Sequence, residues 1–229
     1  MENEKLKKYC LDNLNFEDLG SWPPPEYCYP CLSLCAIDAV FSINTNYEAV
    51  RNVIKRIKNL PFLEPLHEFK QWLEMTLIEK MEMEYFNSQK VGATKRSKIE
   101  ILKDFISVLL KHGFNNKKNF NKFVDNVEID SDLKKIIGIG DTTISYFFML
   151  AGDKNSIKPD RHVKRFISDG SGILTKKITN ELALDKLKSV LPEIKREMQK
   201  RYPSLSSRLT LRSLDYLIWS FQKNIKKTN

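Results

Sequence analysis

One aspartate is the best placed residue in this chain for chemistry on a substrate. Asp160 follows Pro159 and precedes the run RHVKRFI, which has helical character. Because proline disfavours the helical conformation in the residue before it, we predict that a helix starts at Asp160. The dipole of that helix would keep the carboxylate ionised. Such a group can stabilise positive charge on a substrate and can orient or deprotonate an attacking water. The structural alternative is that Asp160 only caps its helix, which is worth about 1 kcal/mol.

Upstream of Asp160, the segment Gly138-Ile139-Gly140 separates two predicted helices. Ser131 is a suitable N-cap for a short amphipathic helix that runs through Ile137. The two glycines allow backbone angles that are closed to other residues, and the isoleucine between them is expected to point inward.

A second helix is predicted to begin after the glycines, capped by Asp141 or Thr142. Residues 131–151 therefore read as helix, tight turn and helix. Backbone N–H groups at the start of the second helix would suit a phosphate. A phosphate-binding turn followed by a carboxylate at a helix start suggests chemistry on a nucleic acid.

The motif GIG-DTT, followed by DRHVKR at residues 160–165, resembles the helix-hairpin-helix DNA glycosylase superfamily, which includes endonuclease III and adenine glycosylases. In that family an LPGVG-like hairpin precedes a catalytic aspartate in a D-x-[HN]-[VI]-x-R-like segment. Ile137 stands where proline is usual. The resemblance implies an all-α, two-lobed fold with the active-site cleft between the lobes. Residues 1–30 and 160–229 would form one lobe, and residues 31–159 the other, with the helix-hairpin-helix at 131–151.

The resemblance also implies an activity. A DNA base-excision repair glycosylase flips a damaged or mismatched base out of the double helix and hydrolyses its N-glycosidic bond, here with Asp160 as the catalytic carboxylate. Bifunctional members carry a nucleophilic lysine at the position of Thr142, and threonine has no amine to form a Schiff base. We therefore expect a monofunctional enzyme. Lys158 could in principle substitute, but an exposed lysine is normally protonated. The alternatives are a non-catalytic helix-hairpin-helix DNA-binding protein and a superfamily enzyme that acts on undamaged DNA.

Several residues are expected to contact the DNA backbone. The hairpin amides would grip it, with a monovalent cation as the family implies, and nearby basic side chains would add a non-specific, salt-sensitive attraction. These residues are Gly138, Ile139, Gly140, Asp141, Thr142, Lys134, Lys135, Lys164 and Arg165.

Three more residues have both a functional and a structural interpretation. Asn44 matches the family's loop [LF]-S-x-[QN], where the amide reaches the DNA near the flipped nucleotide; otherwise it forms an Asx-turn or a helix cap. Asp38 is a polar-face residue, a second acidic group of the site, or, as we expect, a buried carboxylate paired with lysine or arginine. His162 orients Asp160, lines the pocket or, as is commoner for histidine, lies on a helix surface.

The cysteines Cys10, Cys28, Cys31 and Cys35 do not match the iron–sulfur cluster of many family members, which uses four cysteines near the C-terminus. The pattern C-x2-C-x3-C with a distant Cys10 could still bind zinc or iron–sulfur. However, Cys35 lies in a predicted buried helix, where cysteine behaves as a small apolar residue. We expect no required cofactor.

The bulk composition agrees with a DNA partner. The chain has 229 residues, 41% of them hydrophobic, which indicates a folded protein. Its formal charge of +9 favours a polyanionic partner, with a generally lysine-rich proteome as the alternative explanation. No apolar run approaches the length that spans a bilayer, and the N-terminus lacks an apolar signal core. We expect a monomer in the cytoplasm, associated with the nucleoid, without a membrane partner and without disulfides.

These residues must be positioned by helices. Amphipathic or apolar helices are predicted at 4–14, 31–41, 47–57, 62–87, 97–112, 181–191, after Pro192, and 204–225. The proline-rich segment 21–30 is expected to be extended, with Trp22 and Tyr27 attaching it to the body. Two basic loops, 91–98 and 115–123, could touch DNA or simply be solvated.

Overall fold

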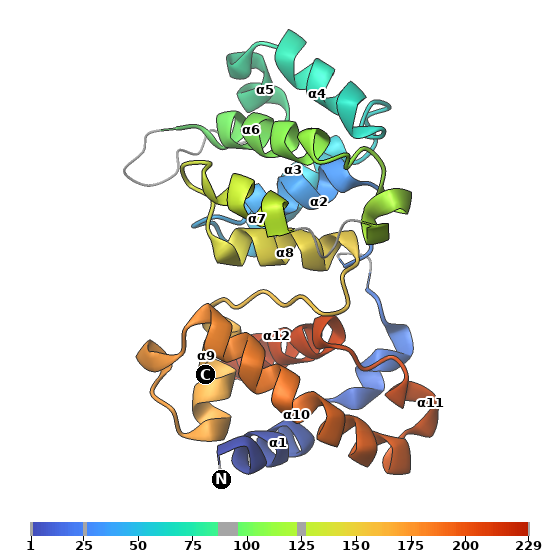
Figure 1. Ribbon diagram of the computed structural model, residues 1–229, viewed down its shortest axis with the longest axis vertical. Helices are drawn as coiled ribbons and strands as arrows, with labels where there is room; N and C mark the ends of the chain where they lie inside the picture. The colour runs from blue at the N-terminus through green and yellow to red at the C-terminus, as the bar shows by residue number, and fades with distance from the viewer. Residues whose placement is uncertain (1, 25–26, 87–95, 123–126, 229) are drawn as a thin grey trace. The chain divides into compact units, whose positions relative to one another are not determined.

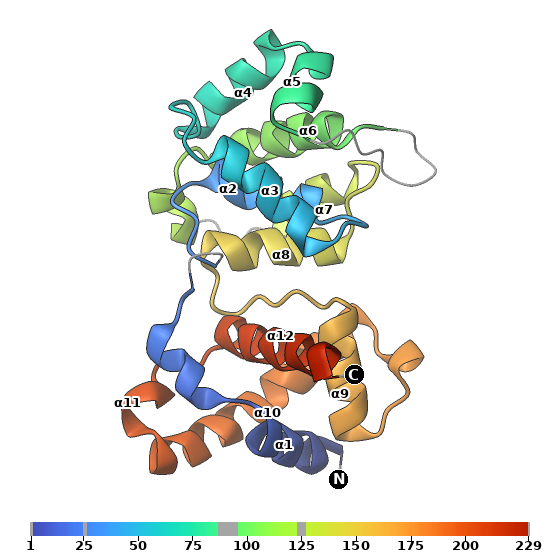
Figure 2. The ribbon, with the colours of Figure 1, turned by 180° about the vertical axis from the view of Figure 1, so that it is seen from behind.

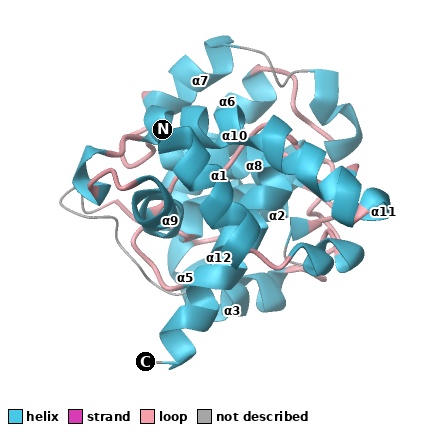
Figure 3. Ribbon diagram, turned by 90° about the horizontal axis from the view of Figure 1, so that it is seen from below, coloured by secondary structure: helices cyan, strands magenta, loops and turns pink. Residues whose placement is uncertain are grey.

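A computed structural model describes residues 2–24, 27–86, 96–122 and 127–228. Helices joined by short connections account for the regular structure of these residues, and none of them forms a strand (Figure 3). The all-α fold class predicted from the sequence is confirmed. Among the described helices, none combines the length and the apolar character needed to cross a membrane.

The chain divides into two compact units. The terminal unit joins Met1–Tyr27 to Lys154–Asn229, and the central unit is the continuous segment Cys28–Asp153. The lobe boundaries expected from the sequence, after residues 30 and 159, lie a few residues further along the chain.

The terminal unit is a cluster of helices around one apolar core. The first helix packs against α9 and α10, so the two ends of the chain meet in this unit (Figures 1 and 2). Gly170 permits the close approach of α9 to α1, because a Cβ there would lie 2.9 Å from atoms of Leu6 and Tyr9. The elements are α1 (Glu2–Asn13), η1 (Phe16–Ser21), α9 (Arg161–Ser171), η5 (Thr175–Lys177), α10 (Asn180–Arg201), α11 (Pro203–Ser206) and α12 (Leu211–Thr228).

Two helix predictions in the terminal unit are wrong in their boundaries. The predicted break at Pro192 is absent, because α10 continues through the proline. Buried residues lie on both sides of it, Val190 and Ile194 among them, and their packing offsets the cost of a proline inside a helix. Conversely, the single helix predicted over 204–225 is divided into α11 and α12.

The start of α12 has a reciprocal cap that explains this division. Thr210 N–H donates to Ser213 Oγ at 2.8 Å, and Ser213 N–H donates to Thr210 Oγ1 at 3.2 Å. The two hydroxyls thereby satisfy backbone N–H groups at the start of a helix, so that a new helix begins at Leu211.

The central unit surrounds the apolar helix α2, in which every residue is buried. Around α2 lie α3, α4, α6 and α8, each in contact with it. The start of α6 is fixed by a capping box between Ser97 and Glu100. The elements are α2 (Leu32–Phe41), α3 (Tyr47–Ile57), α4 (Leu66–Met75), α5 (Ile78–Glu84), α6 (Lys98–Lys111), η4 (Lys117–Lys122), α7 (Val127–Lys134) and α8 (Asp141–Ala151).

The long helix predicted over 62–87 is also wrong, because the chain breaks between α4 and α5 at Thr76. Thr76 is extended, with ψ 133°. The break lets Tyr85 turn back so that its ring lies edge-on to Trp72, with centroids 5.5 Å apart. Aromatic packing thus outweighs the helical periodicity of the sequence.

The connecting segments depart from the predictions only in part. The segment 115–123, predicted as a loop, contains η4, whose Phe120 is buried against Phe114. Of the basic loop 91–98, residues 91–95 lie outside the described residues. In the proline-rich connector, Ser21 ends η1 and is therefore not extended. Trp22 packs on Tyr216 at 5.3 Å between ring centroids, as its predicted attachment requires.

Candidate functional site

Asp160 is the N-cap of α9, as the sequence predicted. Its Oδ1 accepts hydrogen bonds from the N–H groups of His162 at 2.7 Å and Val163 at 3.3 Å. Across the described part of the chain, Oδ2 of Asp160 receives no hydrogen bond from the protein. One oxygen therefore orients the half-buried carboxylate, and the other is left for a substrate or a water.

The turn that carries Asp160 is itself well defined. The N–H of Asp160 donates to Lys158 O at 2.6 Å, which closes a tight turn around Pro159. The N–H of Lys158 then donates to a carboxylate of α12, Asp215 Oδ1, at 2.9 Å. The position of Asp160 thus depends on a residue far along the chain.

Asp215 is the residue that the sequence interpretation missed. It is 3% exposed, and its Oδ2 accepts a hydrogen bond from the hydroxyl of Tyr27 at 3.4 Å. Burial and, second, the negative charge of Asp160 raise the pKa of Asp215 to about 7. The sequence contained one signal that could have identified Asp215, namely an aspartate between Leu214 and Leu217 within an apolar helical run.

Elsewhere on α9, the other candidate residues lie on its first turns. His162 contributes its backbone N–H to the Asp160 cap, and its side chain is half-buried. Lys164 is half-buried and Arg165 is exposed. Asp160, His162, Lys164 and Arg165 therefore share one helix end.

In the central unit, the glycine turn between α7 and α8 differs from the prediction at its first cap. Ser131 lies inside α7, which begins at Val127, so it does not cap that helix. Gly138 has φ 102°, a left-handed conformation that favours glycine. The side chain of Ile139 is only 8% exposed, so its inward orientation is confirmed, whereas Ile137 is 60% exposed.

The second cap is also corrected. Gly140 is the N-cap of α8, and its carbonyl accepts from Thr143 N–H at 2.9 Å and Ile144 N–H at 3.2 Å. Because the helix already begins at Asp141, neither Asp141 nor Thr142 caps it. The carboxylate of Asp141 lies instead in the first turn of α8, where the helix dipole favours a negative charge.

The two lysines before the turn are held by carboxylates. Lys134 Nζ pairs with Asp130 and with Asp141, both at 2.8 Å, and these bonds raise the pKa of Lys134 above its usual range. Lys135 Nζ pairs with Asp132 at 2.7 Å. Neighbouring carboxylates thus compensate both charges that the sequence assigned to DNA contact.

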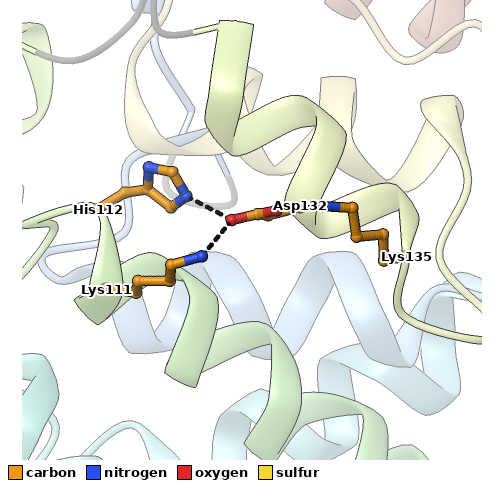
Figure 4. Close-up of polar contacts among 4 residues, drawn as sticks. All are labelled: Lys111, His112, Asp132 and Lys135. Carbon is orange, nitrogen blue, oxygen red and sulfur yellow. Dashed lines mark hydrogen bonds and ion pairs between the residues drawn. The ribbon is translucent and has the colours of Figure 1, made fainter.

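Asp132 also binds the end of α6. Its Oδ2 accepts from Lys111 Nζ at 2.7 Å and lies 3.0 Å from His112 Nε2 (Figure 4). Bonds from Lys111, Lys135 and His112 hold the pKa of Asp132 well below its ordinary value. The helix before the glycine turn is therefore joined to α6 through one carboxylate.

Asn44 lies in the exposed turn after α2 with φ 51°, a left-handed conformation that asparagine tolerates. The cap of α3 is Asn46, whose side chain accepts from Ala49 N–H at 2.9 Å, so the helix-cap interpretation of Asn44 is wrong. The buried side chain of Lys98 fixes this turn. It is 2% exposed and donates to Phe41 O at 2.9 Å and to Thr45 Oγ1.

Asp38 is completely buried and accepts hydrogen bonds from three hydroxyl groups. Tyr29 donates at 2.7 Å, Ser42 at 3.0 Å and Tyr146 at 3.1 Å. Burial and the charge of Asp38 raise the pKa of Tyr29. We expected lysine or arginine as the partner, and these three bonds come from hydroxyl groups. Through the bond from Tyr146, the buried Asp38 joins α2 to α8.

The cysteines are distributed between the two units. Cys10 belongs to the core of the terminal unit, and burial raises the pKa of its thiol to about 12. Cys31 and Cys35 are buried at the start and in the body of α2, and Cys28 is exposed. Within residues 2–24, 27–86, 96–122 and 127–228, no group of three or more His, Cys, Asp or Glu side chains could hold a metal ion.

The structure thus groups the candidates by unit. Asp160, His162, Lys164 and Arg165 belong to the terminal unit, while the glycine turn, Asn44 and Asp38 belong to the central unit. The active-site cleft that the resemblance implies stays a prediction.

Together these features define an all-α protein of two compact helical units. The chain belongs to the family described as Domain of unknown function (DUF8548), which matches residues 4–223. Comparison with curated proteins and with solved structures gave no match.

Proposed function

We propose that this protein is a monofunctional DNA glycosylase of base-excision repair. The observation that supports this most is the cap at Asp160: Oδ1 is fixed by two backbone N–H groups, while Oδ2 is left to act. Cleavage of the bond between a base and C1′ of deoxyribose develops positive charge on the sugar. An ionised, oriented carboxylate stabilises that charge and accepts a proton from the attacking water.

Water is the proposed nucleophile because Thr142 stands at the lysine position of bifunctional family members. Water adds to C1′, the C1′–N bond breaks with its electrons going to the base, and an abasic site remains. The overall charge of +9 supports a DNA substrate, since it favours a polyanion. The protein would act as a monomer on double-stranded DNA of the nucleoid.

An excision screen tests this proposal. Oligonucleotides containing uracil, a thymine mismatch, oxidised guanine or alkylated adenine are incubated with wild type, Asp160→Asn and Asp169→Asn. Asp169 is an exposed carboxylate of the same helix and serves as the matched control. We expect base release by wild type and Asp169→Asn, and at least about 100-fold slower release by Asp160→Asn.

Two outcomes contradict the proposal. Equal release by Asp160→Asn would exclude this aspartate as the catalytic group. DNA binding without release from any of the four substrates would favour the non-catalytic DNA-binding alternative. Trapping of a covalent DNA complex by borohydride would separately contradict the monofunctional mechanism, because it requires a Schiff base.

A further inference from the structure

Asp215 links three segments of the terminal unit. Its two carboxylate oxygens receive the N–H of Lys158, from the segment before α9, and the hydroxyl of Tyr27, from the segment after η1. The guanidinium of Arg212, one turn earlier in α12, donates to the carbonyl of Tyr27. A buried carboxylate with bonds to both oxygens is held firmly, because the loss of either bond would leave a buried polar group without a hydrogen-bond partner, which costs free energy.

The same helix holds the connection to Asp160 at two points. Arg212 N–H donates to Lys154 O at 3.2 Å, and Asp215 accepts from Lys158 N–H at 2.9 Å. The turn from Lys158 to Asp160 follows directly, closed by the 2.6 Å bond between Asp160 N–H and Lys158 O. Displacement of the Lys158 amide would therefore move the Asp160 carboxylate.

We propose that Asp215 is a positioning residue for Asp160. Asp215 fixes the turn that carries Asp160, and it places a second carboxylate beside Asp160. This inference rests on the proposed function, in which Asp160 acts on the substrate. Asp215 itself is buried and acts through the Lys158 amide and through its charge, without contact with DNA.

The charge of Asp215 gives the site a pH dependence. The groups that act on Asp215 are Asp160 and Lys158 from the preceding segment and the Tyr27 hydroxyl. Burial and the charge of Asp160 raise the pKa of Asp215 to about 7, so the site gains a second negative charge as the pH rises through neutrality. A second carboxylate stabilises a cationic transition state further, so base release should increase with pH in this range.

Two substitutions separate position from charge. Asp215→Asn keeps an oxygen that can accept from Lys158 N–H but removes the ionisation. Asp215→Leu removes both. We expect Asp215→Asn to lose the rise of kcat between about pH 6 and 8, and Asp215→Leu to lose about 100-fold in kcat at every pH, with KM changed less than about threefold. Ser213→Ala, a buried residue of α12 bonded to Thr210 and Arg208, is the control for general weakening of the helix.

A second readout does not depend on activity. Carboxyl-carbon NMR titration should show the pKa of Asp215 falling in Asp160→Asn, because the neighbouring charge is removed. Amide hydrogen exchange at Lys158 should accelerate in Asp215→Leu but not in Ser213→Ala. An unchanged Asp215 titration or unchanged Lys158 exchange would overturn the inference. If wild type releases no base but both NMR results appear, the proposed function fails while the coupling of Asp160 and Asp215 stands.

Discussion

At the scale of single residues, Asp160 has an observed role as an N-cap and a proposed role in catalysis, and substitution can separate the two. As an N-cap it uses only Oδ1, and an asparagine at the same place has an equivalent oxygen. Catalysis requires the negative charge as well. The capping and catalytic interpretations are therefore compatible, and the choice of replacement residue distinguishes them.

We predict that Asp160→Ala lowers the free energy of unfolding by about 1 kcal/mol, whereas Asp160→Asn changes it by less than half of that. The reason is that alanine leaves the His162 and Val163 N–H groups without their acceptor. Urea unfolding monitored by circular dichroism measures both changes. Equal destabilisation by the two substitutions would show that the charge, and not the capping oxygen, stabilises α9.

At the scale of helices, local signals predicted the elements best where their caps are local. Asp160 before α9 and Ser97 before α6 bond to N–H groups within a few residues, so the sequence contains the whole interaction. Two of the errors occur where distant partners decide, whereas the start of α12 was missed although its Thr210–Ser213 cap is local. The break at Thr76 depends on the ring of Tyr85 against Trp72, and Asp215 depends on Tyr27, from which it is separated by 188 positions.

The link between α6 and α7 also belongs to this scale. Asp132 receives bonds from Lys111, Lys135 and His112. Its pKa is lowered in the folded protein, so it stabilises the fold above the ordinary carboxyl pKa of about 4, and this contribution is lost as the pH falls below that value.

We therefore predict that Asp132→Asn destabilises the protein at neutral pH and that its difference from wild type shrinks as the pH is lowered from about 4 to 2. Thermal unfolding at a series of pH values gives this difference. Asp104→Asn removes the carboxylate of another ion pair, with Arg96, and should show a smaller effect. A difference from wild type that is the same at pH 7 and pH 2 would contradict the assignment of the bonds to the ionised carboxylate.

At the scale of the whole molecule, the net charge of +9 includes lysines whose charge is already compensated by neighbouring carboxylates. Near the glycine turn, Lys134 and Lys135 are paired with carboxylates, and Asp141 lies in the first turn of α8. The sequence identified these lysines but did not show that carboxylates pair with them. The partners are three to seven residues away, and whether they reach the lysines depends on where α7 ends. If the turn binds a phosphate, Asp141 must weaken that binding.

We predict that Asp141→Asn tightens DNA binding about fivefold at low salt, equivalent to about 1 kcal/mol, because it removes one of the two carboxylates paired with Lys134 and a negative charge at a helix N-terminus. Fluorescence anisotropy with a labelled duplex over a range of salt concentrations tests this. Glu68→Gln, at an exposed position of α4, changes the net charge equally. Equal tightening by both substitutions would mean that net charge alone acts and that the turn is not the contact.

The discontinuous terminal unit has a consequence for how the protein is made. Helix α1 precedes the central unit in the chain, yet α9 and α10, which cover Leu6 and Cys10, are synthesised after it. The continuous segment Cys28–Asp153 can fold while translation proceeds. Throughout that interval the apolar side of α1 remains uncovered on the nascent chain, and the Asp160 site is completed only when α12 has emerged.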